Sequence, residues 1–146
     1  MGKNIDSYIK EQFEISPVDV KTYSPLTLAY MGDGVFDLII RSVVVGKGNT
    51  KASQLHLRTS QIVKAHSQAV LIETLVPYLT EEEMDVYRRG RNAKSPTMAK
   101  HASMSDYRKA TGLEALMGYL YVTDQFERAV ELVRLGLSKT DRISLE

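Results

Sequence analysis

The chain has 146 residues, of which 43% are apolar and 25% are charged, and this composition excludes a disordered protein and suits one globular domain. It contains no cysteine, which excludes disulfides and thiolate metal sites and fits an intracellular protein, so we expect a cytoplasmic location. The net charge is only +1, and no apolar run reaches the length of a membrane span.

Six helical segments are predicted in chain order, and no segment convincingly predicts a strand. Alternatively, the third segment consists of two helices with a break near residues 58–61. The polar tail from about residue 138 is expected to be frayed. The whole chain, residues 1–146, is predicted to form a single all-α domain. The expected helices cover residues 5–14, 25–45, 50–76, 80–90, 105–122 and 124–137.

The ends of these helices are predicted from capping residues. Ser24 followed by Pro25 is a typical helix start, and Thr80 with Glu83 matches a capping box. The stop signal of the second helix is Gly46. The caps or first residues expected for the other segments are Thr50, Ser105 and Asp124.

Residues 91–104 show no periodicity, and a loop of that length in a small domain is usually functional. Between Val86 and Lys109 there are seven basic residues and one acid, Asp106, so this window carries +6 and the rest of the chain about −5. Such a charge fits a polyanion, whereas a solvated surface is the alternative for the loop alone. Aromatic residues are scarce here, which favours recognition of a duplex backbone over base stacking. The candidate backbone contacts are Arg88, Arg91, Lys94, Lys100 and His101.

Asp33 lies in a helix pattern dominated by apolar residues, with a glycine on each side of it. On a 3.6-residue period it falls on the same side as Phe36 and Ile40. A glycine in a helix interior costs about 1 kcal/mol relative to alanine, but Gly32 and Gly34 leave the backbone open to close approach by a partner. We therefore interpret Asp33 as a site residue; a buried hydrogen bond to another helix is the alternative.

A second lone carboxylate, Glu114, lies in the middle of the apolar helix expected over residues 105–122. One such group in each of two core helices predicts that Asp33 and Glu114 face each other. Two unpaired carboxylates would raise each other's pKa, and a divalent cation with hard oxygen ligands and waters, such as Mg²⁺, removes this conflict. In the alternative, one carboxyl group is protonated and hydrogen-bonds the other. Asp37 and Arg41, one turn apart, are expected to form a salt bridge or to belong to an interface.

These motifs resemble those of the ribonuclease III family. Residues 28–36, LAYMGDGVF, are similar to the signature helix of the family, and residues 111–118, TGLEALMG, are similar to its second acidic motif. The resemblance covers nearly the whole chain as a nuclease domain and leaves no room for the usual C-terminal double-stranded-RNA-binding domain. The resemblance is greatest to the Mini-ribonuclease III branch of the family. It rests on residues 107–116, YRKATGLEAL, and on the basic segment 88–101.

The resemblance implies an all-helical homodimer that cuts both strands of an RNA duplex with Mg²⁺, or Mn²⁺ in its place. Asp33 and Glu114 would be the catalytic residues and metal ligands, and Asp33 would also orient the attacking water. The implied substrate is precursor 23S ribosomal RNA, presented by a ribosomal protein or an assembling ribosomal subunit. The residues expected to face the second subunit are Phe36, Asp37 and Ile40.

The sequence departs from the family pattern at three acidic positions. Ala29 and Thr111 stand where the family has a glutamate and an aspartate, and a further carboxylate is absent near residues 64–66. We therefore expect weak, water-rich coordination of the ion. The alternative function is a module of the same fold that binds duplex RNA without cutting it. A helical assembly protein that uses the Asp37–Arg41 face is a third interpretation.

Overall fold

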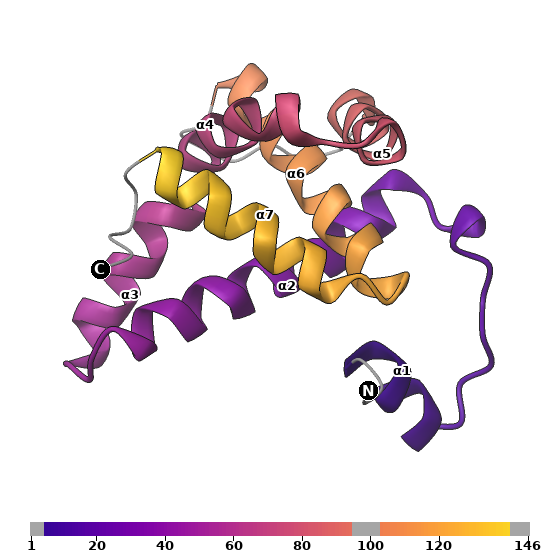
Figure 1. Ribbon diagram of the computed structural model, residues 1–146, viewed down its shortest axis with the longest axis horizontal. Coiled ribbons are helices and arrows are strands. Elements are labelled where there is room, and N and C mark those ends of the chain that lie inside the picture. The colour runs from indigo at the N-terminus through magenta and orange to yellow at the C-terminus, as the bar shows by residue number, and fades with distance from the viewer. Residues whose placement is uncertain (1–4, 95–102, 141–146) are drawn as a thin grey trace.

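The computed structural model describes residues 5–94 and 103–140, and this part of the chain consists of helices with no strand, which confirms the all-α prediction (Figure 1). Two of the helices, η1 and η2, are single 3₁₀ turns. None of the described helices is long and apolar enough to cross a membrane. The elements are α1 (Ile5–Gln12), η1 (Val20–Thr22), α2 (Pro25–Gly46), α3 (Ala52–Val63), α4 (Ala65–Leu75), η2 (Val76–Tyr78), α5 (Glu81–Asn92), α6 (Met104–Val122) and α7 (Phe126–Lys139).

Two helix starts follow the capping signals in the sequence. The Ser24 side chain accepts a hydrogen bond from the backbone N–H of Thr27, and Pro25 occupies the first turn of α2. At α5 both bonds of the predicted capping box are present, between Thr80 and Glu83. These signals succeed because a cap acts within four residues, so the sequence contains all of the interacting groups.

Other boundaries differ from the prediction. The helices α3 and α4 are separated at Lys64, not near residues 58–61, because side chains of α4 bind the last carbonyl groups of α3: Ser67 Oγ donates to the carbonyl of Gln61 at 2.6 Å. The first residue of α6 is Met104, capped by Ser103. Asp124 does not cap α7, since it adopts a left-handed φ of 62°. Lys51, not Thr50, precedes α3, and α7 continues to Lys139, two residues beyond its expected end.

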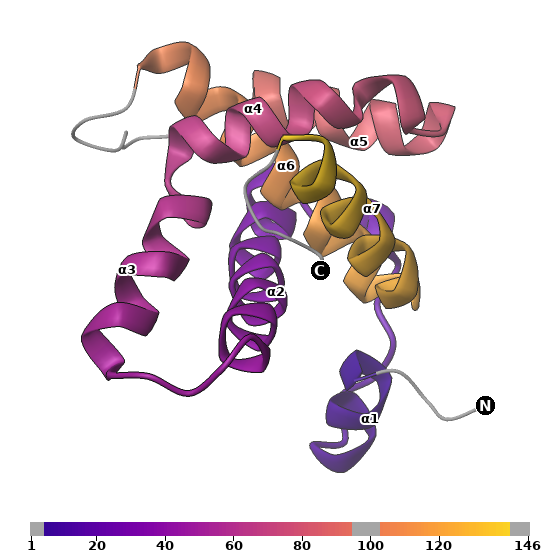
Figure 2. The same ribbon diagram turned by 60° about the vertical axis from the view of Figure 1, so that its left-hand side comes forward.

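The core is built around α6, which lies against α2, α4 and α5 in both views (Figures 1 and 2). Leu113, Leu116 and Leu120 of α6 have no exposed surface, which confirms the apolar face expected for them. Burying a side chain of this size stabilises the fold by about 1.5–3 kcal/mol. Because α6 is surrounded on most sides, a polar group in its middle is held rigidly by the packing around it.

The backbones of α2 and α6 touch where they cross. A Cβ atom added at Gly32 would lie 1.6 Å from the carbonyl oxygen of Glu114, and one added at Gly118 would lie 1.9 Å from the carbonyl oxygen of Leu28. No other residue type fits at these two positions without moving a helix. Gly34 is different, since a Cβ there would meet nothing within 4 Å. The close approach expected of both glycines beside Asp33 therefore holds only for Gly32.

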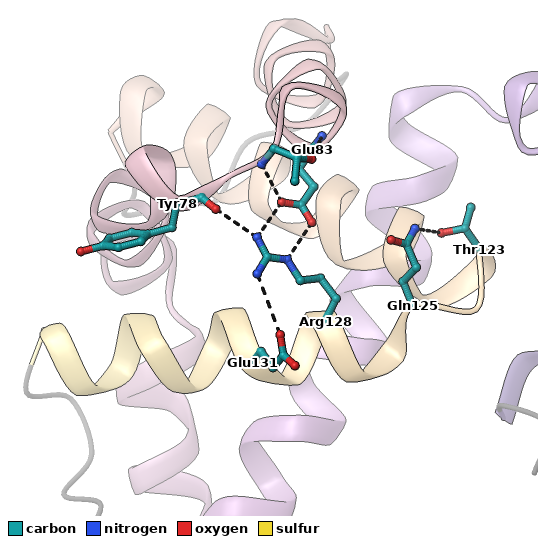
Figure 3. Close-up of polar contacts among 7 residues, drawn as sticks. Tyr78, Glu83, Thr123, Gln125, Arg128 and Glu131 are labelled. Carbon is teal, nitrogen blue, oxygen red and sulfur yellow. Dashed lines mark hydrogen bonds and ion pairs between the residues drawn. The ribbon is translucent and has the colours of Figure 1, made fainter. Parts of the chain in front are cut away.

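An ion pair joins α5 to α7. Arg128 donates from Nε to Glu83 Oε2 and from Nη2 to Glu83 Oε1, both at 2.9 Å, and also to the carbonyl of Tyr78 (Figure 3). The Glu83 side chain is only 6% exposed. The hydrogen bonds from Arg128 lower the pKa of Glu83 below its ordinary value, and they outweigh the opposite effect of burial.

This ion pair predicts a loss of stability in acid. A carboxyl group with a lowered pKa in the folded state stabilises the fold above its ordinary pKa and loses this contribution as the pH falls through the folded-state value. We expect Glu83→Gln to lower the free energy of unfolding by about 2 kcal/mol at pH 7. Below pH about 4.5, the free energy of unfolding of the variant should fall less steeply with decreasing pH than that of wild type. Urea unfolding between pH 3 and 7 measures both, with the exposed Glu127→Gln as control. If the free energy of unfolding depended on pH equally for Glu83→Gln and wild type, Glu83 would not be the source of the loss of stability in acid.

Candidate active site

The structure brings Asp33 and Glu114 together at the crossing of α2 and α6. Asp33 follows Gly32, whose backbone lies against the backbone of Glu114. Burial raises the pKa of Glu114, and the charge and hydrogen bonding of Asp33 raise it further, to about 8. The two carboxyl groups therefore lie close enough to interact across the contact.

Asp33 is exposed, whereas Glu114 is partly buried. The expectation that Asp33 lies among apolar residues in a dry place is therefore wrong. The buried side of α2 contains Leu28, Val35 and Ile39, and the 3.6-residue period puts Asp33 at the edge of this side, next to the solvent. The pair thus has one carboxylate that is partly buried and one that a large substrate can reach.

The two carboxylates fit a hydrated divalent cation. Neither belongs to an ion pair among the described residues. Among the same residues no group of three or more histidine, cysteine or acidic side chains is arranged so that it could hold a metal ion. The missing family acids have structural replacements: Ala29 is buried, and Thr111 Oγ1 donates to the carbonyl of Tyr107 at 3.0 Å. Two hard oxygen ligands without a cationic partner suit Mg²⁺, which retains several waters in protein sites.

Gln68 of α4 lies beside Glu114, although the sequence pattern does not single it out. Its side chain is buried, and its amide lowers the pKa of Glu114 against the larger effects of burial and Asp33. The available signal was a lone amide within a largely apolar helix. A glutamine in such a pattern is usually a core residue with satisfied hydrogen bonds, so the pattern alone does not assign it a role.

The basic residues near the loop fall into two groups. Arg91 lines a cavity of about 370 Å³ together with Arg108 and Lys109, where the end of α5 meets the start of α6. The Arg91 guanidinium also lies 5.6 Å from the centre of the Tyr87 ring. Lys94 follows α5 and is exposed. The other two candidates, Lys100 and His101, lie outside the described residues.

Arg88 does not join this group. It lines a different hollow, whose other lining side chains include Glu81, Glu82 and Asp85. Lys109 forms an ion pair with Glu73, which partly neutralises the cavity. The described basic residues between Val86 and Lys109 therefore lie in two different places. Only Arg91, Arg108 and Lys109 line the same cavity.

Phe36 and Ile40 are 1% and 0% exposed, because they pack in the chain's own core. The expectation that they face a second subunit is therefore wrong. Asp37 does form the predicted salt bridge with Arg41, at 2.6 Å. The side of α2 that remains open holds both of these residues and three large exposed apolar side chains, namely Tyr30, Leu38 and Val45.

Comparisons with known proteins agree with the motifs in the sequence. The sequence model of the Ribonuclease III domain matches residues 26–125. The chain is 46% identical over 126 residues to Mini-ribonuclease 3 of Clostridium tetani, covering 86% of this chain and 83% of that protein. It is 39% identical over 137 residues to Mini-ribonuclease 3 of a Thermoanaerobacter species, covering 94% and 96%. A crystal structure of a Fusobacterium nucleatum protein has a TM-score of 0.76 at 25% identity, covering 85% of this chain and 99% of that one. The chain therefore belongs to the ribonuclease III family and, within it, to the Mini-ribonuclease 3 group.

Proposed function

We propose that the chain is a Mg²⁺-dependent endoribonuclease that hydrolyses both strands of double-stranded RNA. The observation that supports this most is the meeting of Asp33 and Glu114 with no basic partner among the described residues, at a place open to a polymer. The similarity to proteins named Mini-ribonuclease 3 supports the ribonuclease activity. Mn²⁺ has the same preference for oxygen ligands and would substitute for Mg²⁺.

Each carboxylate has a distinct task in this proposal. Both would hold the ion, which when bound activates water and neutralises charge on the phosphate. Glu114 is fixed by the packing of α6, so it sets the position of the site. Asp33, on the solvent side, orients the attacking water by accepting a hydrogen bond from it. Rigid placement of reacting groups contributes much of the rate enhancement in such enzymes.

The basic residues would bind the RNA backbone beside the cut. Arg108 precedes Glu114 by six residues on α6, which is about 9 Å along the helix axis at 1.5 Å per residue. Phosphates next to the reacting one would therefore lie near Arg91, Arg108 and Lys94. We include Lys100 and His101 in this surface on charge alone.

We infer that the natural substrate is precursor 23S ribosomal RNA, cut at paired ends in the cytoplasm. The support is the similarity to the Mini-ribonuclease 3 group together with the concentration of positive charge around residues 88–109. A ribosomal protein or an assembling subunit would present this RNA. Such presentation would add to the RNA affinity of a domain that has few basic residues on any one face.

The test compares a long RNA duplex with its separated strands and with a DNA duplex of the same sequence. We expect Mg²⁺-dependent cleavage of the RNA duplex alone, and none with EDTA. Binding of duplex RNA without cleavage, even with Mn²⁺ and excess protein, would favour the binding module, which Ala29 and Thr111 in place of family acids make the second candidate. Cleavage of single strands at the same rate would contradict the proposed substrate.

We propose that the protein is a homodimer that uses the open side of α2. Tyr30, Leu38 and Val45 are 85%, 49% and 58% exposed, and the 3.6-residue period puts them on one stripe with Asp37 and Arg41. Asp33 borders this stripe, so a second copy packed there would bring two carboxylate pairs close together. Such an arrangement suits the cutting of two strands.

The dimer predicts a strong effect of Leu38→Glu. A charge at the centre of the contact would weaken association by about 30-fold or more, equivalent to about 2 kcal/mol. Analytical ultracentrifugation across a range of concentrations measures the change, with Val130→Glu on α7 as a matched control that replaces another exposed aliphatic residue. A monomeric wild-type protein at all concentrations would overturn the dimer.

A further inference from the structure

Gln68 lies on α4, which packs against both α3 and α6, and it is only 4% exposed. Its Nε2 atom donates a hydrogen bond to the carbonyl of Val63 at 2.7 Å. This bond satisfies one of the carbonyl groups that the end of α3 leaves free. Holding the end of α3 is therefore one role of the side chain, and it uses the nitrogen only.

The amide oxygen of Gln68 has no such explanation. A carbonyl group only accepts hydrogen bonds, so the amide cannot turn over without placing two acceptors 2.7 Å apart at Val63. The orientation is thus fixed, and Oε1 is buried with no hydrogen-bond donor among the described residues. It is the one buried side-chain polar atom in that part of the chain with this property. An unpaired buried acceptor destabilises a fold by about 1–3 kcal/mol, so it calls for a partner from outside the chain.

The position of Gln68 shows what that partner would be. Its helix, α4, packs against α6, and its amide acts on the carboxyl group of Glu114, whose pKa it lowers. Glu114 of α6 therefore interacts on one side with Asp33 of α2 and on another with the uncharged amide of α4. Two carboxylates leave most positions around Mg²⁺ to water, and each of those waters needs an acceptor for its outward hydrogen atoms.

We propose that Gln68 is a positioning residue of the cation site: its buried oxygen accepts a hydrogen bond from a water of the bound ion. The inference rests on the proposed function, because it requires that Asp33 and Glu114 hold a divalent cation. A neutral oxygen that accepts this hydrogen bond supports such a site without adding a third negative charge next to two carboxylates. Residues that bind the ligands and waters of a metal typically change its affinity 10–100-fold when they are replaced.

The experiment measures ion binding directly, in the absence of RNA. Mn²⁺ is titrated into the full chain, and the free aqua ion is counted by electron paramagnetic resonance. Gln68→Met removes both polar atoms at nearly constant volume, and we expect it to weaken Mn²⁺ binding about 10-fold. Gln54→Met is the matched control, since Gln54 is exposed on α3, and we expect it to bind as wild type does.

Gln68→Glu separates the proposed role from the structural one. It keeps an oxygen acceptor but loses the donor to Val63, so a residue that only holds the end of α3 would be impaired equally by Glu and by Met. In the proposed role Gln68→Glu binds Mn²⁺ at least as tightly as wild type, whereas Gln68→Met does not. Weaker binding by Gln68→Glu than by wild type overturns the inference, and this comparison stands even if Gln68→Met does not fold.

Asp33→Asn distinguishes failure of this inference from failure of the proposed function. If Asp33→Asn weakens Mn²⁺ binding and Gln68→Met does not, the cation site stands and the role of Gln68 is overturned. If Asp33→Asn binds Mn²⁺ as wild type does, the carboxylate pair is not the cation site, and both proposals are overturned together.

Discussion

Glu114→Gln should abolish cleavage of duplex RNA, by about 1,000-fold or more, while it leaves duplex binding within about twofold. The replacement keeps the shape of the side chain but removes the charge that would hold the cation. RNA binding depends instead on the basic side chains, which the change does not touch. Cleavage rates at saturating protein and gel-shift measurements in EDTA separate the two effects.

The same substitution should stabilise the protein when no divalent cation is present. The pKa of Glu114 is raised to about 8 in the folded chain, from 4.5. A carboxyl group with a raised pKa binds more protons in the folded than in the unfolded state, so its ionisation destabilises the fold progressively between these two pH values. A glutamine carries no such penalty. The free energy of unfolding of Glu114→Gln should therefore exceed that of wild type by on the order of 4 kcal/mol at pH 8 and differ little from it at pH 4.5.

Urea unfolding in EDTA at both pH values checks this prediction, with Glu127→Gln as the exposed control. Added Mg²⁺ should narrow the gap at pH 8, because it compensates the charge of the wild-type pair and has less to bind in the variant. An equal free energy of unfolding for Glu114→Gln and wild type at pH 8 would show that the charge of Glu114 does not destabilise the folded chain. Retained cleavage by Glu114→Gln would remove it from the active site.

Gly32→Ala and Gly34→Ala should have opposite effects, although the two residues flank the same aspartate. A Cβ at position 32 would lie 1.6 Å from the carbonyl oxygen of Glu114 and 2.7 Å from the backbone nitrogen of Gly118, so α2 and α6 would have to separate. We expect a loss of about 3 kcal/mol or more in the free energy of unfolding. Because this contact also sets the position of Glu114 relative to Asp33, cleavage should fall even where the variant remains folded.

Gly34→Ala should instead raise the free energy of unfolding by about 1 kcal/mol, which is the difference in helix propensity between the two residues. A Cβ at this position meets nothing within 4 Å, and cleavage should continue. Urea unfolding at several protein concentrations measures both variants and separates folding from association. Similar losses for Gly32→Ala and Gly34→Ala would contradict the close contact of α2 and α6.

Local signals in the sequence predicted those parts of the fold that depend on neighbouring residues. Ser24 and Thr80 begin helices as expected because a cap and its partners lie within one turn. The predicted break near residues 58–61 differs from the observed one at Lys64. The hydrogen bonds that end α3 come from Ser67 and Gln68, which are side chains of the next helix, α4. A periodic pattern does not register such bonds, because it describes which residues share a face and not which groups reach across a junction.

The candidate site shows the same division between pattern and packing. Asp33 and Glu114 were identified because a lone carboxylate in an apolar helix needs a reason, and this argument requires only the sequence. The pattern did not tell which side of α2 faces the core, since apolar residues occupy both: Phe36 and Ile40 are buried, whereas Tyr30 is exposed.

The sequence by itself thus determined the helical class, the family, and the two acidic residues that we propose as ligands. Only the tertiary structure decided that Asp33 lies open to solvent and Glu114 is partly buried, that Gly32 but not Gly34 lies against another backbone, and that the side-chain oxygen of Gln68 is buried with no hydrogen-bond partner among the described residues. The physical reason is that periodicity describes one helix, whereas burial, charge interaction and unpaired atoms depend on the contacts between several.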